Sequence, residues 1–209
     1  MLHELPLKSD RPTKMTDNYV WTPGCNLNIK LRDQDLKIKE LIGSQPCNMD
    51  NALGVTTNAE QWTTEVYSFP IPALLMKRIG KGLSLRNMSR SLRLIEDKEQ
   101  FIESLQSQSN SVRIISVFKQ REQRLLPNEN DPKEKVNNGL GELVTIEISH
   151  LAGPEDIFTL SIEHASIYKV IAAIQEIMRD ADKQAYSGMI FMNYLQAVKI
   201  WGLGKKLFN

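Results

Sequence analysis

Three short runs that alternate apolar and charged residues constrain the fold of this chain more than any other feature. They span residues 26–32, 36–42 and 112–121. Side chains two residues apart on a strand point to the same face, so each run predicts a strand with one apolar face and one cationic side. The bases lie at six positions: Lys30, Arg32, Lys37, Lys39, Lys119 and Arg121. If these faces converge, they form a site for a polyanion; if they do not, they are ordinary solvated faces.

A later pair of runs carries acids where the early runs carry bases. Residues 143–149 and 157–163 also alternate, which predicts a second hairpin, and their polar faces include Glu147 and Glu163. Arg and Lys bind phosphate oxygens directly, whereas carboxylates hold Mg²⁺ or Mn²⁺ ions that bridge phosphates. We therefore expect the six bases to bind phosphate, and the two glutamates to hold a metal ion or to orient the bases.

The alternation is compatible with two kinds of packing. In a sandwich or a helix-covered sheet, the apolar faces point inward and the polar faces are solvated. In a wide barrel, the apolar faces point outward under helices and the polar faces line a wet tunnel. Two details weaken the sandwich alternative. Bases and acids are sorted between strands, and Ile115 and Val117 share a face with Lys119 and Arg121, so that face is not uniformly solvated.

The remaining elements are predicted around these strands in a single domain, 1–209. Residues 1–15 read as an irregular lead-in, residues 43–59 as a loop and residues 96–106 as a short helix. Residues 165–209 carry two amphipathic helices. The second has an apolar stripe that we expect to pack on the outside of the barrel; it comprises Phe191, Tyr194, Leu195, Val198 and Trp201.

Composition restricts the class of partner. The chain has 26 basic and 25 acidic residues, a net charge of +1, which argues against a general nucleic-acid-binding domain. Nothing approaches the run of about 18 apolar residues that a membrane span needs. Cys25 and Cys47 form no Cys-x-x-Cys pair, so we read them as free thiols of a cytoplasmic protein. The expected partner is a phosphorylated small molecule, with neither nucleic acid nor membrane.

The first predicted hairpin, with Thr16-Asp17-Asn18-Tyr19-Val20 before it, resembles the CYTH domain of the triphosphate tunnel metalloenzymes. The order of later elements is similar too: a Trp-containing strand, the Lys-x-Arg strand at 119–121, two strands that each carry a Glu, then helices. The resemblance covers roughly residues 15–180. It implies an α+β fold, an antiparallel tunnel barrel of about eight strands with covering helices, two of them C-terminal. It also implies bases that bind a triphosphate and acids that bind Mg²⁺ or Mn²⁺.

The chain departs from that family at its N-terminus. The family signature on the first strand is Glu-x-Glu-x-Lys, whereas residues 3–8 offer only Glu4 and a proline. The anion-binding half of the expected site is therefore better kept than the metal-binding half. Two functions remain open: metal-dependent hydrolysis of a triphosphate, and a non-catalytic ligand-binding or protein-interaction module.

Overall fold

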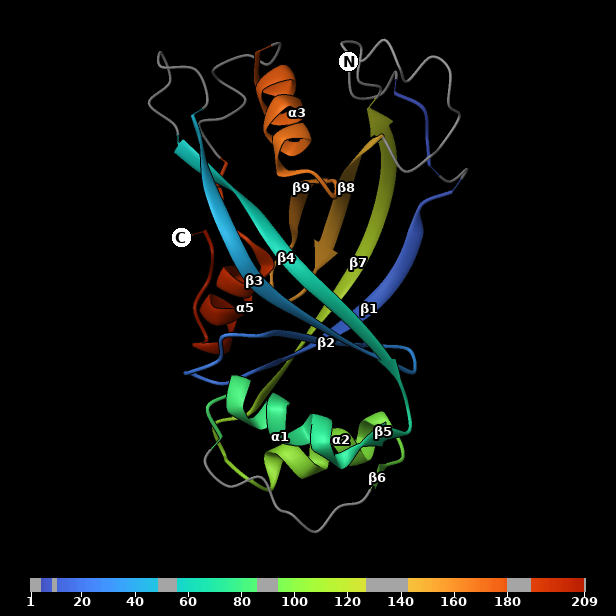
Figure 1. The fold of residues 1–209 in the computed structure, drawn as a ribbon, viewed down its shortest axis with the longest axis vertical. Coiled ribbons are helices and arrows are strands. Elements are labelled where there is room, and N and C mark those ends of the chain that lie inside the picture. Colours follow the sequence, from blue (N-terminus) through green and yellow to red (C-terminus); the bar gives the residue numbers. More distant parts are fainter. Residues whose placement is uncertain are drawn as a thin grey trace.

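The computed structural model describes residues 5–8, 11–48, 56–85, 94–126, 143–179 and 189–208. Its main element is a seven-stranded antiparallel sheet in the order β4-β3-β2-β1-β7-β8-β9 (Figure 1). The strands of this sheet are β1 (Thr13–Trp21), β2 (Asn28–Arg32), β3 (Asp35–Asn48), β4 (Thr56–Ser68), β7 (Arg113–Leu126), β8 (Val144–Ala152) and β9 (Ile157–Glu163). The fold is thus α+β with an antiparallel sheet, as predicted.

Four helices and a small second sheet accompany the main sheet in the described part of the chain. The second sheet pairs β5 (Ile71–Pro72) with β6 (Leu94–Ile95). The helices are α1 (Ala73–Gly82), α2 (Lys98–Gln106), α3 (Ile167–Arg179) and α5 (Tyr194–Gly202). None of these helices has the length and apolar character needed to cross a membrane.

The pairing register divides the sheet into two chemically different faces. Residues directly opposite each other in an antiparallel pair carry their side chains on the same face. Tyr19 on β1 is opposite both Lys30 on β2 and Ile115 on β7, and Lys30 is opposite Lys37 on β3. We call the face that carries these four residues the inner face, and the opposite one the outer face.

The outer face of β2 and β3 is apolar and is covered by helices. Ile29 and Leu36 are buried there against Ile79 of α1 and Phe101 of α2. Full burial of such a side chain stabilises the fold by about 2 kcal/mol. Figure 1 shows α1 and α2 together at one end of the sheet. In β2 and β3, apolar side chains thus lie under helices and polar side chains lie on the other face, which is the arrangement expected for these strands in a barrel.

The sheet is strongly curved toward its inner face. Asn193, which caps α5, bonds to Glu60 on β4, and Trp201 near the other end of α5 bonds to Glu155 beside β9. In a flat sheet β4 and β9, six positions apart, would be separated by about 29 Å, whereas the nine residues of α5 span about 14 Å. The two ends of the sheet therefore bend toward each other, and the inner face is concave.

The curved sheet is not a closed barrel among the residues that the structure describes. β4 and β9 are the end strands, and no ladder joins them. Helix α3 contacts β4, β8 and β9, so it spans the two ends of the sheet. Its Ala173 and Ile177 are buried against Val144 and Ile146 on β8. The prediction of a curved antiparallel sheet with covering helices is thus confirmed, whereas the closure of that sheet into a tunnel barrel of about eight strands is not observed in the described residues.

Two predicted boundaries are wrong. The lead-in expected over residues 1–15 ends earlier, because β1 begins at Thr13 and pairs with β7 from that residue on. The loop expected over residues 43–59 is largely strand, because β3 continues to Asn48 and β4 begins at Thr56. A shift in register between Leu41 and Gly43 lets this long pair continue past the point where the clear alternation ends.

Helix α5 packs on the inner face, not outside the sheet as its apolar stripe led us to expect. Val198 and Trp201 of α5 are buried against Trp21 and Val117, which lie on the inner face. Part of that face is itself apolar and needs cover, which is the physical reason for the difference. Gly202 allows the close approach, because a Cβ at this position would collide with the ring of Trp21.

Both ends of α5 are anchored to polar groups of the sheet. Asn193 caps the helix and also donates from Nδ2 to Glu60 on β4 at 2.7 Å. At the other end, Trp201 Nε1 donates at 2.7 Å to Glu155 in the turn between β8 and β9. Because Glu60 and Glu155 lie on or beside the two end strands, α5 bridges the same opening that α3 spans.

Candidate functional site

All eight residues predicted for the site lie on the inner face. Alternate residues along a strand share a face, so Arg32 and Lys39 lie on the same face as Lys30 and Lys37. The pairing of β1 with β7, β7 with β8 and β8 with β9 carries the same face across to the late strands. The residues brought to this face are Lys30, Arg32, Lys37, Lys39, Lys119, Arg121, Glu147 and Glu163. The three cationic runs therefore share one face of the sheet.

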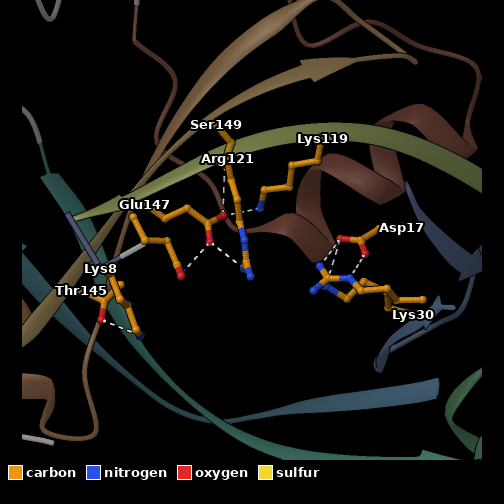
Figure 2. Close-up of polar contacts among 10 residues, drawn as sticks. Lys8, Asp17, Lys30, Lys119, Arg121, Thr145, Glu147 and Ser149 are labelled. Carbon is orange, nitrogen blue, oxygen red and sulfur yellow. Dashed lines mark hydrogen bonds and ion pairs between the residues drawn. The ribbon is translucent and has the colours of Figure 1, made fainter. Parts of the chain in front are cut away.

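Asp17 gathers the two bases of β2 into one cluster. Its side chain is buried on β1 and accepts from Lys30 Nζ at 3.0 Å, from Arg32 Nε at 2.6 Å and from Arg32 Nη2 at 2.9 Å. Figure 2 shows the side chain of Lys30 reaching Asp17. The fork of Arg32 binds both carboxylate oxygens, which is the strong bidentate form of this contact. We call these three residues the Asp17 cluster.

Glu147 gathers the two bases of β7 into a second cluster. Its buried carboxylate forms an ion pair with Lys119 and accepts from Arg121 Nη1 at 3.2 Å. Gln123 Nε2 donates to it at 3.1 Å, and the Ser149 hydroxyl donates at 3.2 Å. Figure 2 shows Lys119, Arg121 and Ser149 directed toward this carboxylate. We call these five residues the Glu147 cluster.

Two tyrosines lie between the clusters. The rings of Tyr19, on β1, and Tyr194, the first residue of α5, stack with centroids 5.8 Å apart. Lys30 Nζ lies 5.7 Å from the Tyr19 centroid, and Lys119 Nζ lies 5.0 Å from the Tyr194 centroid. Each ammonium thus interacts with a tyrosine ring face as well as with its carboxylate. The two clusters and the tyrosines form one continuous polar layer.

Burial and charge oppose each other at both carboxylates. Burial by itself raises the pKa of Asp17, but Arg32 and Lys30 outweigh it, so that this pKa lies below its usual value. Burial likewise raises the pKa of Glu147, and Lys119 and Arg121 reverse the shift. Both carboxylates are therefore ionised at neutral pH and hold their bases as fixed counter-ions.

The bases respond to burial in different ways. Burial lowers the pKa of Lys30 to about 8, despite the opposing effect of Asp17. Burial also acts to lower the pKa of Lys119, but Tyr194 and Glu147 outweigh it and the pKa is raised. Lys30 therefore loses its charge at a lower pH than an ordinary lysine does.

Lys37 and Lys39 are the two predicted site bases that form no ion pair with a described residue. Both are half-buried on β3, and neither forms an ion pair or a hydrogen bond with any described residue. Burial and the neighbouring positive charges of Lys39 and Arg32 lower the pKa of Lys37. Half-buried ammonium groups that repel one another are stabilised by an added anion.

Sequence reasoning assigned no role to several inner-face residues. The sequence marks Asp17 only as part of the motif at residues 16–20, and its register opposite β7, two residues from Tyr19, is what places it among the bases. The sequence predicts Tyr194 in an outer stripe, whereas it lies on the inner face. Lys8, whose Nζ lies 3.5 Å from the Thr145 hydroxyl, fell in the expected lead-in (Figure 2). The sequence does carry one signal for Asp17. It lies two positions before Tyr19 in a β-prone run, so the two side chains share a strand face.

The predicted metal ligands have a poor arrangement for a cation. An ionised carboxylate has about four acceptor positions, and Glu147 already accepts from Lys119, Arg121, Gln123 and Ser149. In the part of the chain that the structure describes, no three His, Cys, Asp or Glu side chains form a group suited to a metal. A metal between Glu147 and Glu163 would have to displace bases from Glu147. Mg²⁺ or Mn²⁺ stays a prediction.

Comparisons with known proteins do not identify a family. No family model, no curated protein and no solved structure matches this chain. The resemblance to the CYTH domain therefore rests on the residues of this sequence alone.

Proposed function

We propose that this protein binds a phosphorylated small molecule with several negative charges on its cationic inner face. The observation that carries the proposal is the pair Lys37 and Lys39, which are half-buried and form no ion pair with a described residue. A ligand phosphate that meets these ammonium groups would neutralise charges that the described protein leaves unbalanced. Arg32, which influences the pKa of Lys37, is near enough to contribute to the same site.

The charge balance of the inner face supports a ligand with more than one negative charge. Six predicted bases share that face with the carboxylates of Asp17 and Glu147, which are buried, and of Glu163, which is exposed. Each buried carboxylate already binds two bases, so its single charge leaves a local excess of positive charge. Lys binds phosphate as a point charge and Arg as a planar fork, so both geometries are available.

We further propose that the ligand is enclosed in the manner of a tunnel. The support is that α3 contacts both end strands, while α5 is anchored to Glu60 on β4 and Glu155 beside β9. Water excluded by such cover strengthens the attraction between ligand and bases. Cys25 and Cys47 are free thiols, and the expected cytoplasmic location stays a prediction.

The proposal is tested by titrating the full chain with inorganic tripolyphosphate in a calorimeter at low and moderate salt. Replacing Lys37 and Lys39 by Ala should weaken binding by at least about ten-fold, the equivalent of about 1.4 kcal/mol. The matched control replaces Lys77 and Lys98, which lie on α1 and α2, and should leave the affinity unchanged. Absence of binding by the unmodified protein would contradict the proposal.

Glu147 is poorly placed to hold a metal for hydrolysis, because its oxygens are engaged by four donors. The sequence-based prediction of a metal-dependent triphosphatase is tested separately. Tripolyphosphate would be incubated with the protein and Mg²⁺ or Mn²⁺, and released phosphate would be measured. Release that depends on Glu147 would restore the catalytic alternative.

A further inference from the structure

Helix α5 contributes a side chain to a site that is otherwise built from strands. Tyr194 is its first residue, and the ring lies against Tyr19 and close to the ammonium of Lys119. The helix cannot move freely from this position, because Asn193 is held by Glu60 and Trp201 by Glu155. The position of the Tyr194 hydroxyl is thus set by the tertiary structure.

Two buried donors beside Lys119 have no acceptor. The Tyr194 hydroxyl and Arg121 Nε are both shielded from solvent, and neither donates a hydrogen bond to a described residue. A buried donor without a partner costs free energy, and native proteins leave few of them. Arg121 is two residues from Lys119 on β7, and both bind Glu147. An ammonium and two unused donors therefore lie in the same part of the inner face.

We propose that Tyr194, Arg121 and Lys119 form one subsite for a phosphate oxygen, so that α5 is part of the ligand site and not only its cover. This rests on the proposed function, since it names the contacts that the far end of the same anion makes. Lys37 and Lys39 on β3 bind one end of the ligand, and the subsite on β7 and α5 binds the other. A phosphate oxygen has several lone pairs and accepts from three such donors at once.

The subsite is tested with Tyr194→Phe and tripolyphosphate in the full chain. Phenylalanine keeps the ring that stacks on Tyr19 and removes only the hydroxyl, so the melting temperature should stay within about 1 °C. Affinity should fall about ten-fold, as expected for a lost hydrogen bond to a charged group. Tyr168→Phe, at an exposed position of α3, is the matched control and should bind as the unmodified protein does.

A second measurement separates ligand contact from a purely structural role. Hydrogen exchange of residues 194–202 should slow when tripolyphosphate is added to the unmodified protein, and should slow less in Tyr194→Phe. If Lys37→Ala weakens binding while Tyr194→Phe does not, and exchange in α5 is unaffected, the subsite is overturned and the proposed function stands. If the unmodified protein does not bind tripolyphosphate, both are overturned.

Discussion

The buried carboxylate of Asp17 offers the sharpest test of how the inner face is held together. Asp17→Asn keeps the size and shape of the side chain and removes its charge. The carboxylate is 1% exposed and accepts three hydrogen bonds from Lys30 and Arg32, whose side chains are 14% and 27% exposed. The substitution therefore leaves two partly buried cations side by side without their counter-ion.

The expected loss of stability follows from that burial. Removing one partner of a buried ion pair costs about 3–5 kcal/mol, and we take the lower end, about 3 kcal/mol, because Arg32 reaches solvent. In a chain of this size each kcal/mol lowers the melting temperature by about 2–4 °C, so the expected fall is about 6–12 °C. Asp156→Asn, whose side chain is 80% exposed, is the matched control and should change little.

The same variant links stability to the ligand. Because tripolyphosphate would replace the missing negative charge, it should raise the melting temperature of Asp17→Asn by more than that of the unmodified protein. Thermal unfolding followed by circular dichroism, with and without tripolyphosphate, measures both effects. A melting temperature within about 1 °C of the unmodified protein would show that Asp17 is not the counter-ion that its geometry indicates.

Three further predictions concern the charge of the site and the position of α5. Because the pKa of Lys30 is lowered to about 8, the affinity for tripolyphosphate should fall as pH rises through that value. Arginine stays charged over this range, so Lys30→Arg should lose less affinity than the unmodified protein when both are titrated at each pH. Gly202→Ala forces a Cβ against Trp21 and should destabilise the protein by about 1–3 kcal/mol in denaturant titration, with weaker anion binding because Tyr194 moves with the helix. Asn193→Ala removes the helix cap and the bond to Glu60, and should speed hydrogen exchange in α5 while the sheet core keeps its protection.

Several elements were predictable because their signals are local. The alternation in residues 26–42 determines a hairpin with one apolar and one cationic face, and β2 and β3 follow it. The late hairpin and the helix stripe that begins at Ile167 are found where the periodicity places them. Period alone also predicted which residues share a strand face, since Lys30 and Arg32 can only point the same way.

Other elements were missed because their signals are weak or distant. The extension of β3 to Asn48 passes through Gly43 and Pro46, residues that indicate a loop in isolation, and only the long ladder with β4 stabilises it as strand. The face of the sheet against which α5 packs could not be predicted from local sequence either. The apolar stripe of α5 could pack on any apolar surface, and its position on the inner face depends on Trp21 and Val117, which lie far away in the sequence.

By itself the sequence determined the chemistry of each strand face: which side chains are bases, which are acids, and which of them point together. Only the tertiary structure decided that the faces meet. The curvature that lets α5 reach both β4 and the turn before β9, and the register that places Asp17 among the bases, depend on contacts between residues far apart in the chain. Side-chain period is a local property of backbone geometry, whereas sheet order, curvature and helix docking are set by the sum of many long-range contacts.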